Sequence, residues 1–311
     1  MRNIASFDVG GTFIKYGVIS EEGNILVKGK FETPSNNCKE EIPVVIIQRV
    51  KELESSCCID AVGISTAGQI DTEKGEIIFA SDNLPGYTGA KLSEEIMDKL
   101  GLRCFVENDV NCAALGELWK GAGEGKKSFV CIALGTGVGG AIIIDGKLYK
   151  GIGGSAGEIG HSIIDIHGEP CACGSNGCYE RFASTSALIR RYSERSNIEV
   201  EKLSGELIVS KAKAGEELAS EVYDEFLDNI VVGLVNVTHI LDPGLIILGG
   251  GISAQGKPFF DEINLRFRKK VMKYYSGYTE IVQAKLENDA AIIGAAYNAF
   301  GNMTKICRLE S

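Results

Sequence analysis

Three cysteines lie within eight positions of the 311-residue sequence, in the glycine-containing stretch PCACGSNGC. Cys171, Cys173 and Cys178 lack one ligand for the tetrahedral set of thiolates and imidazoles that a structural zinc ion uses. His161, in the preceding GEIGH, can supply it, and His167, which is nearer in sequence, is the alternative. A disulfide would leave one odd thiol, and no CxxC redox pair occurs here. The pattern therefore predicts a zinc ion with four protein ligands and a structural rather than catalytic role.

Two glutamates flank this cysteine segment. Glu158 belongs to GEIGH, and Glu180 follows the last cysteine after a single residue. A zinc ion would pin their two loops against each other, and carboxylates fixed in one place are good acceptors for the hydroxyl groups of a sugar. Both could instead be ordinary surface residues. Their position inside glycine-rich segments next to the metal motif favours a sugar-binding role.

Three glycine turns follow apolar stretches that read as strands. DVGGT at 8–12 and GTG at 135–137 can expose backbone N–H groups to phosphate oxygens. The third turn, in DPGLIILGGGIS at 242–253, can admit the flat face of a nucleotide base. GTGVGG also matches the dinucleotide-binding fingerprint, but β-branched residues rather than a helix follow it, which excludes that interpretation. Each turn alone could be only a tight turn with positive φ. Together they indicate a nucleoside triphosphate.

Two carboxylates stand at strand ends where phosphoryl transfer needs them. Asp8 precedes the first glycine turn, where it can hold Mg²⁺ through water or simply cap the turn. Asp109, in VENDVNCAALGE, lies where a strand meets a helix and can take the proton of an attacking hydroxyl or cap the helix. Asn108 can likewise bind a polyol or act as a cap. Positioning, charge neutralisation and one base are what phosphoryl transfer requires.

The elements that must position these residues follow an α/β pattern. The first fifty residues predict strands at 4–7, 14–19 and 25–30 and a helix from residue 40, with Pro43 in its first turn. Residues 128–151 repeat the order of apolar strand, glycine turn, strand, short turn and strand, which suggests a duplicated lobe. The remaining strands are expected at 61–65, 103–106 and 245–248, and the remaining helices at 91–100, 110–120, 216–241, 258–274 and 289–300.

Charge and hydropathy narrow the class of protein. Thirty-two basic and 42 acidic residues give a formal net charge of −10, which disfavours nucleic acid and anionic membranes as partners. The N-terminal apolar run is short and is interrupted by Asp8, so no signal peptide is expected. The longest apolar stretch, near 230–241, falls short of the roughly 20 residues that span a bilayer. We expect a cytoplasmic protein with reduced thiols, whose other cysteines in apolar runs are core residues: Cys57, Cys58, Cys104, Cys112 and Cys131.

Taken together, the motifs resemble the ROK family of sugar kinases and its relatives, within the actin-like ATPase fold. The motifs that carry the resemblance are DVGGTFIKYG (8–17), ISTAGQID (64–71), SDNLPGY (81–87), ENDVNCAALGE (107–117), LGTGVGGA (134–141), GEIGH (157–161), CACGSNGCYE (171–180) and DPGLIILGGGIS (242–253). The resemblance implies a two-lobed α/β, RNase H-like duplicated fold with a cleft between the lobes. Residues 1–120 would form a small lobe, joined by a C-terminal helix at about 289–311. Residues 121–288 would form a larger lobe with the zinc site.

The resemblance also implies roles for single residues. The sugar would contact Gly68, Asn83, Asn108, Asp109, Glu158, His161 and Glu180, with Asp109 as the base for the 6-hydroxyl. The ATP phosphates would lie at Gly10, Gly11, Thr12, Gly135, Thr136 and Gly137, and the adenosine near Gly249 and Gly250. His161 would serve both the sugar and the zinc set, which it completes with Cys171, Cys173 and Cys178.

The expected activity is an ATP-dependent, Mg²⁺-requiring hexose kinase of glucokinase type, acting as a homodimer. Glucose is the first expectation, and N-acetylmannosamine, N-acetylglucosamine, fructose or a β-glucoside are the alternatives. The family also contains transcriptional repressors with a DNA-binding module ahead of the first glycine turn. Only seven residues precede Asp8, so we expect an enzyme rather than a sugar-sensing regulator. Two departures, Ala67 where many members carry Pro and Ala141 where Gly is frequent, bear on sugar selectivity rather than on the reaction.

Overall fold

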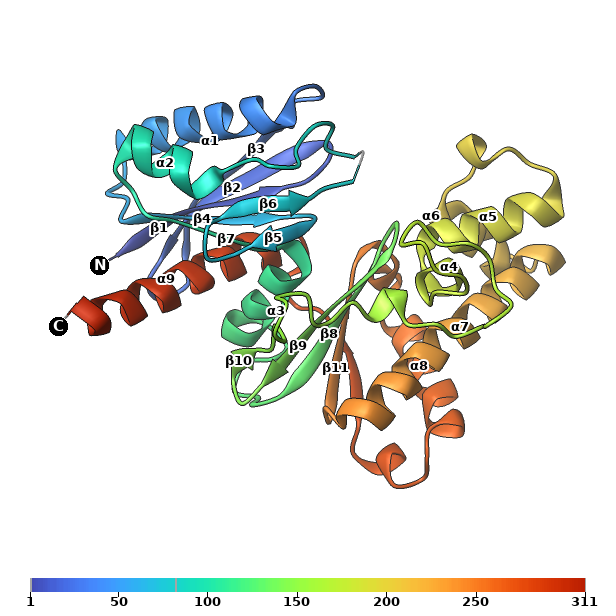
Figure 1. Ribbon diagram of the computed structural model, residues 1–311. Helices are drawn as coiled ribbons and strands as arrows, with labels where there is room; N and C mark the ends of the chain where they lie inside the picture. Colours follow the sequence, from blue (N-terminus) through green and yellow to red (C-terminus); the bar gives the residue numbers. More distant parts are fainter. Residues whose placement is uncertain (1, 82, 311) are drawn as a thin grey trace. The chain divides into compact units, whose positions relative to one another are not determined.

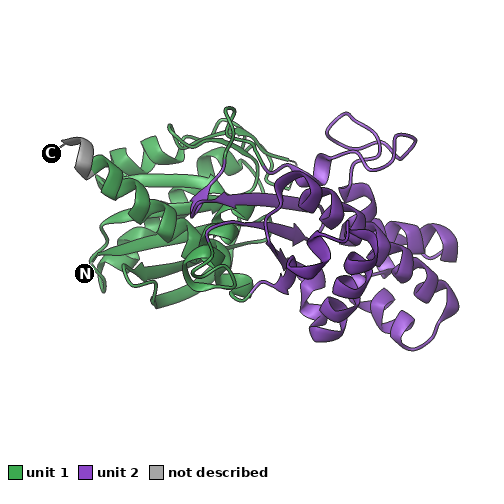
Figure 2. Ribbon diagram, turned by 90° about the horizontal axis from the view of Figure 1, so that it is seen from below, with its two compact units in different colours: residues 1–126, 150–156, 285–311 green, residues 127–149, 157–284 purple. Residues whose placement is uncertain are grey.

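The computed structural model describes residues 2–81 and 83–310, and side chains up to residue 306. The chain forms two compact units, coloured separately in Figure 2. Unit 1 comprises residues 1–126, 150–156 and 285–311, and unit 2 comprises residues 127–149 and 157–284. The sequence-based division placed 121–126, 150–156 and 285–288 in the second lobe, whereas in the structure these segments belong to unit 1. Lys150, in the second of them, forms an ion pair with Glu107 of unit 1.

Unit 1 is built on a five-stranded sheet with the order β3-β2-β1-β4-β7. Its strands are β1 (Asn3–Val9), β2 (Phe13–Ser20), β3 (Ile25–Glu32), β4 (Ala61–Thr66) and β7 (Cys104–Asn108). β1, β2 and β3 pair antiparallel through tight turns, whereas β1, β4 and β7 pair parallel. A separate hairpin, which the sequence did not predict, consists of β5 (Gln69–Asp71) and β6 (Glu76–Phe79).

Helices cover both faces of this sheet (Figure 1). α1 (Cys38–Glu54) and α2 (Leu92–Leu100) lie on one face, and α3 (Asp109–Lys120) and α9 (Ala290–Glu310) on the other. All six residues of the interior strand β4 are therefore buried, as expected for a parallel strand between two helical layers. α1 begins two residues earlier than predicted, so Pro43 lies beyond the first turn, where its missing N–H removes a helical hydrogen bond.

The sheet of unit 2 repeats that of unit 1. Its order is β10-β9-β8-β11-β12, from the strands β8 (Phe129–Leu134), β9 (Val138–Ile144), β10 (Lys147–Leu148), β11 (Leu245–Gly249) and β12 (Glu280–Gln283). Again the first three strands pair antiparallel and the last two join in parallel. The duplication that the glycine turns suggested is therefore confirmed strand by strand.

The helices of unit 2 are α4 (Glu180–Ala183), α5 (Thr185–Ser196), α6 (Gly205–Lys213), α7 (Glu217–Leu241) and α8 (Lys257–Lys270). Short 3₁₀ segments are η1 (Ile159–His161), η2 (Val200–Lys202), η3 (Gly251–Gln255) and η4 (Tyr275–Gly277), and η5 (Glu287–Asp289) lies in unit 1. Buried residues of α7 such as Phe226, Ile230 and Leu234 pack into one apolar core with β8 and β11. α8 ends four residues before the predicted end, because Val271 is extended.

Two expectations about the chain as a whole can be compared with the described residues. None of the helices in that part of the chain has the length and apolar character to cross a membrane. Cys104, Cys112 and Cys131 are buried, as predicted. The prediction is wrong for Cys58, which is exposed, because it lies in the loop after α1 rather than in a strand.

Candidate active site

A strand-to-helix corner in unit 1 presents Asp109. β7 ends at Asn108, whose side-chain oxygen accepts hydrogen bonds from the backbone N–H groups of Val110 (3.0 Å) and Asn111 (3.2 Å). Asn108 is thus the N-cap of α3, and Asp109 is the first helical residue. The Nδ2 group of Asn108 also donates to the carbonyl of Gly68 at 3.3 Å. Since Asn108 supplies the cap, the Asp109 carboxylate is available for another role.

Asp8 lies close enough to Asp109 for their charges to interact. Burial raises the pKa of Asp109, the charge of Asp8 raises it further, and the backbone N–H of Val110 opposes both. Burial also raises the pKa of Asp8, against the lowering effect of Lys15, whose Nζ lies 3.6 Å from Oδ2, and of the Ser65 hydroxyl at 2.9 Å. A carboxylate with a raised pKa is a stronger base than an ordinary aspartate.

The first glycine turn is held in place by Thr33. The Thr33 hydroxyl donates to the carbonyl of Gly10 (2.6 Å), and its backbone N–H donates to the carbonyl of Thr12 (3.0 Å). Gly11 packs against the backbone of Asn83, because a Cβ at position 11 would lie 3.2 Å from the Asn83 carbonyl oxygen. Unit 1 thus brings a predicted phosphate turn and a predicted sugar residue into contact.

Gly68 needs to be glycine on two counts. Its φ of +111° is rarely adopted by residues with a side chain, and a Cβ would lie 2.4 Å from the carbonyl oxygen of Phe79. The carbonyl of Gly68 is fixed by Asn108. The loop after β4 is therefore tied directly to the corner that carries Asp109.

In unit 2 the second glycine turn lies against Glu180. The carbonyl of Gly135 accepts a hydrogen bond from the backbone N–H of Thr185 (2.8 Å). A Cβ at Gly137 would lie only 2.8 Å from Oε2 of Glu180. Thr136, between the two glycines, is exposed at the tip of the turn. One end of the predicted sugar-binding set therefore touches the predicted phosphate turn.

The third glycine turn lies next to the second glycine turn. Gly249 ends β11, and Gly250, with a φ of +85°, follows it. A Cβ at Gly250 would lie 2.3 Å from the carbonyl oxygen of Leu134, the residue that precedes Gly135. The turns predicted for the adenosine and for the phosphates are thus adjacent within unit 2.

The cysteine segment forms a compact donor cluster. The ligand atoms of His161, Cys171, Cys173 and Cys178 all lie within 4.8 Å of one another. Nδ1 of His161 is 3.6 Å from Sγ of Cys171, and Sγ of Cys173 is 3.5 Å from Sγ of Cys178. Zinc bonds of about 2.3 Å to sulfur and about 2.0–2.1 Å to nitrogen place tetrahedral ligands about 3.5–3.8 Å apart. The four residues fit a zinc ion, and His167 is not part of the cluster.

The thiols of the cluster have shifted pKa values. Burial raises the pKa of Cys171 to about 12, whereas a backbone hydrogen bond from Ser175 lowers the pKa of Cys173. The two glutamates lie at the edge of the cluster: Oε2 of Glu158 is 3.9 Å from Nε2 of His161, and Oε1 of Glu180 is 3.7 Å from Nδ1. A metal here would brace both carboxylates through His161.

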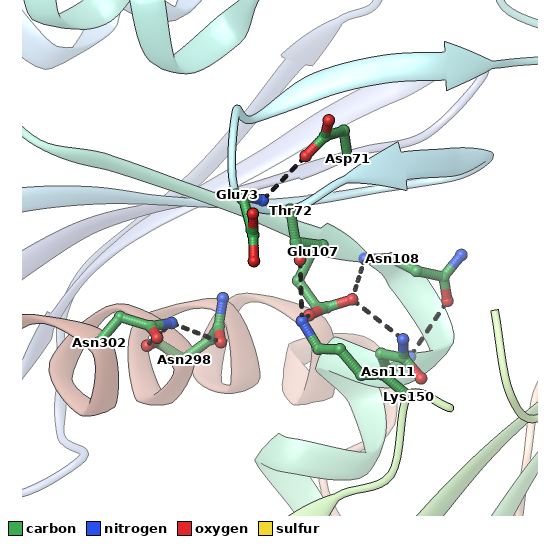
Figure 3. Close-up of polar contacts among 9 residues, drawn as sticks. All are labelled: Asp71, Thr72, Glu73, Glu107, Asn108, Asn111, Lys150, Asn298 and Asn302. Carbon is green, nitrogen blue, oxygen red and sulfur yellow. Dashed lines mark hydrogen bonds and ion pairs between the residues drawn. The ribbon is translucent and has the colours of Figure 1, made fainter. Parts of the chain in front are cut away.

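The predicted site residues therefore form two sets. The set in unit 1 consists of Asp8, Gly10–Thr12, Gly68, Asn83 and Asp109 and their neighbours. The set in unit 2 consists of Gly135–Gly137, Gly249–Gly250 and the metal cluster. Two polar residues of unit 1 were missed by the sequence: Glu107, which is buried directly before the Asn108 cap, and its ion-pair partner Lys150 (Figure 3). The sequence signal for Glu107 was a glutamate beside an apolar strand. No local sequence pattern identifies Lys150.

Comparison with known proteins places these features in a family. The ROK family model matches residues 4–300. A glucokinase from Thermotoga maritima is 34% identical over 300 residues, covering 93% of this chain and 94% of the relative. An N-acetyl-D-glucosamine kinase from Photobacterium profundum is 30% identical, covering 94% and 97%.

The structure agrees with this assignment. A ROK family glucokinase from Streptomyces griseus, solved in complex with glucose and AMPPNP, superposes with a TM-score of 0.80 at 34% identity, covering 94% of this chain and 98% of the other. This likeness, with the repeated sheet order, confirms the predicted duplicated α/β fold of actin-like type. The chain belongs to the ROK family of proteins.

Proposed function

We propose that this ATP-dependent hexose kinase of the ROK family phosphorylates the 6-hydroxyl of glucose, with Asp109 as the general base. The observation that carries the proposal is the corner in unit 1, where Asn108 supplies the helix cap and the half-buried Asp109 has a raised pKa. The Thermotoga maritima and Streptomyces griseus relatives, both named glucokinases, support glucose as the acceptor. The Photobacterium profundum relative makes an N-acetylhexosamine the second candidate.

The reaction assigned to Asp109 is a proton transfer coupled to an in-line displacement. The carboxylate takes the proton of the 6-hydroxyl as its oxygen forms a bond to the γ-phosphorus of ATP. The bond between the γ-phosphorus and the β–γ bridging oxygen breaks, and ADP leaves with that electron pair. Sugar 6-phosphate and a protonated Asp109 result, and the proton then passes to solvent.

The glycine turns and Asp8 are assigned to the charge of the nucleotide. Backbone N–H groups of Gly10–Thr12 and Gly135–Gly137 would bind phosphate oxygens, and the turn at Gly249–Gly250 would lie near the adenosine. Asp8, whose pKa is raised by burial against the lowering effect of Lys15 and Ser65, would hold Mg²⁺ through water. When bound, Mg²⁺ neutralises the negative charge of the transferring phosphoryl group.

The remaining sugar contacts are assigned to Gly68, Asn83, Asn108, Glu158, His161 and Glu180. Structural zinc at His161, Cys171, Cys173 and Cys178 would hold the two glutamates of this set in place. A homodimer and a cytoplasmic location remain predictions. Light scattering at micromolar concentration tests the first, and a mass equal to one chain, 33.3 kDa, would contradict it.

A coupled ADP-release assay over a panel of hexoses tests the proposed acceptor. The panel should hold glucose, mannose, fructose, N-acetylglucosamine, N-acetylmannosamine and a β-glucoside, each at several concentrations. We expect the highest kcat/KM for glucose, with product that glucose-6-phosphate dehydrogenase oxidises. A higher kcat/KM for an N-acetylhexosamine would replace glucose as the acceptor, and product that this dehydrogenase does not use would exclude the 6-position.

A further inference from the structure

A buried glutamate lies directly behind the corner that carries Asp109. Glu107 is 1% exposed, at the end of β7. Its Oε1 accepts hydrogen bonds from the backbone N–H of Asn108 (3.0 Å) and from Nδ2 of Asn111 (3.0 Å). Figure 3 shows the carboxylate between these two residues and Lys150. Glu107 therefore fixes the residue before Asp109 and a residue in the first turn of α3.

Lys150 supplies the positive charge that this carboxylate needs. Its Nζ forms an ion pair with Oε2 of Glu107 and donates to the hydroxyl of Thr72 at 3.1 Å. The carbonyl of Lys150 also accepts from the backbone N–H of Ala156 (3.0 Å), which closes the segment 150–156 into a loop. A carboxylate this deeply buried is costly unless a cation and hydrogen bonds compensate it. In unit 1, Lys150 is the cation that compensates Glu107.

We infer that Lys150 and Glu107 are positioning residues for Asp109, and this inference rests on the proposed base role of Asp109. The ion pair keeps both oxygens of Glu107 in place, so that Oε1 can hold the backbone of Asn108 and the side chain of Asn111. These two residues define the corner from which the Asp109 carboxylate projects. Neither Lys150 nor Glu107 takes the proton itself, so the pair acts on the rate of the chemical step through geometry.

Neutral substitutions separate this role from a general contribution to folding. Lys150→Met leaves Glu107 buried without its cation, so the corner should distort. Glu107→Gln keeps an oxygen that can accept from Asn108 and Asn111 but carries no charge. In the double variant no uncompensated charge remains, so the corner should recover although the ion pair is gone. A merely structural ion pair would show this pattern in Tm, while kcat stayed at the wild-type value in all three variants.

The experiment measures kcat and both KM values for the two single variants and the double variant. We expect kcat of Lys150→Met to fall roughly 10–100-fold with sugar and ATP KM within about threefold of wild type, as for an interaction that acts in the transition state. Glu107→Gln and the double variant should both keep kcat within about fivefold of wild type. Lys305 is an exposed lysine on α9 that lines a surface hollow together with Thr72 and Lys150. Lys305→Met is the matched control and should not change kcat.

The inference is overturned if Lys150→Met keeps wild-type kcat, if its loss appears only in KM, or if the double variant is as slow as Lys150→Met. Should Lys150→Met not fold, Lys150→Arg and the double variant carry the test: both should fold and turn over, and a slow double variant refutes the pair. Asp109→Asn measured beside them tests the base role separately. Full turnover in that variant refutes the base, whereas a slow Asp109→Asn without rescue in the double variant refutes only the positioning role.

Discussion

Replacing Asp109 with Asn should remove the proposed base and leave the corner intact. The cap and the bond to Gly68 come from Asn108, and an amide oxygen at 109 can still accept from the backbone N–H of Val110. We therefore expect sugar and ATP affinities within about threefold of wild type, whereas kcat should fall by roughly 10²–10⁴, the usual contribution of a general base. In the wild-type enzyme, kcat/KM should rise with pH through the raised pKa of Asp109.

The same substitution should stabilise the folded protein at neutral pH. Because burial and Asp8 raise the pKa of Asp109, the folded state binds this proton more tightly than the unfolded chain does. The ionised carboxylate therefore lowers the free energy of unfolding above the folded pKa, and this cost vanishes below the ordinary value of about 3.9. A neutral amide avoids the cost. We expect Tm at pH 7.5 to rise by a few degrees and the gain to shrink toward pH 4.

The assay combines ADP release, calorimetric sugar binding and thermal unfolding at pH 4.5 and 7.5. Asp98→Asn, at an exposed position on α2, is the control and should change neither turnover nor the pH dependence of Tm. Near-wild-type turnover in Asp109→Asn would leave that carboxylate without a catalytic role. An equal Tm gain at both pH values would show that ionisation of Asp109 is not what costs stability.

Three further predictions concern the metal cluster, the second glycine turn and the hydrogen bonds of Glu117 to the backbone at residues 285 and 286. Chelation, or Cys173→Ser, should lower Tm and raise the sugar KM more than the ATP KM, because the zinc would hold Glu180 and its neighbours. Gly137→Ala should push the Glu180 carboxylate aside and raise the sugar KM severalfold with little change in Tm, since a flexible side chain yields rather than backbone. Glu117→Gln should lower the free energy of unfolding by about 2–4 kcal/mol, because its buried carboxylate accepts from three backbone N–H groups, at residues 122, 285 and 286.

Each of these has a control and a contradicting result. Cys58→Ser removes an exposed thiol and should leave metal content and both KM values unchanged. Protein prepared under reducing conditions without stoichiometric zinc would rule out the metal, and equal rises in the two KM values would show only a scaffold role. An unchanged sugar KM in Gly137→Ala would separate Glu180 from the sugar. Glu124→Gln, at an exposed position after α3, is the control for Glu117, and equal stability of the two variants would refute the buried carboxylate's contribution.

The sequence predicted the strands of the two sheets better than the helices of unit 2. β1, β2 and β4 are short apolar runs bounded by glycine or polar turns, so the local sequence pattern is enough to predict them. α5 and α6 were missed because both helices are short and carry charged residues on their surfaces. β12 was missed because it has only four residues and becomes a strand only by pairing with β11.

The sequence predicted the residues of the candidate site where those that act together lie in one short motif. Residue type and spacing are enough to identify the cysteine segment, the glycine turns and the Asn108–Asp109 pair. Other contacts join residues that are far apart in sequence, and no periodicity encodes them. Examples are the hydrogen bond from Thr33 to Gly10 and the contact between Gly137 and Glu180. Long-range polar contacts of this kind appear only when the fold is known.

Glu107 and Asp109 show how one corner gives two carboxylates different properties. They are separated by one residue, yet Glu107 is matched by Lys150 and two hydrogen-bond donors, whereas Asp109 has Asp8 as its charged neighbour. The oxygens of Glu107 are occupied by Lys150 and by two hydrogen-bond donors, so neither is free to accept the proton of a substrate hydroxyl. A carboxylate that faces another negative charge gains from protonation. The identity of the neighbours, rather than the carboxylates themselves, therefore supports the proposed positioning role of Glu107 and the proposed proton transfer by Asp109.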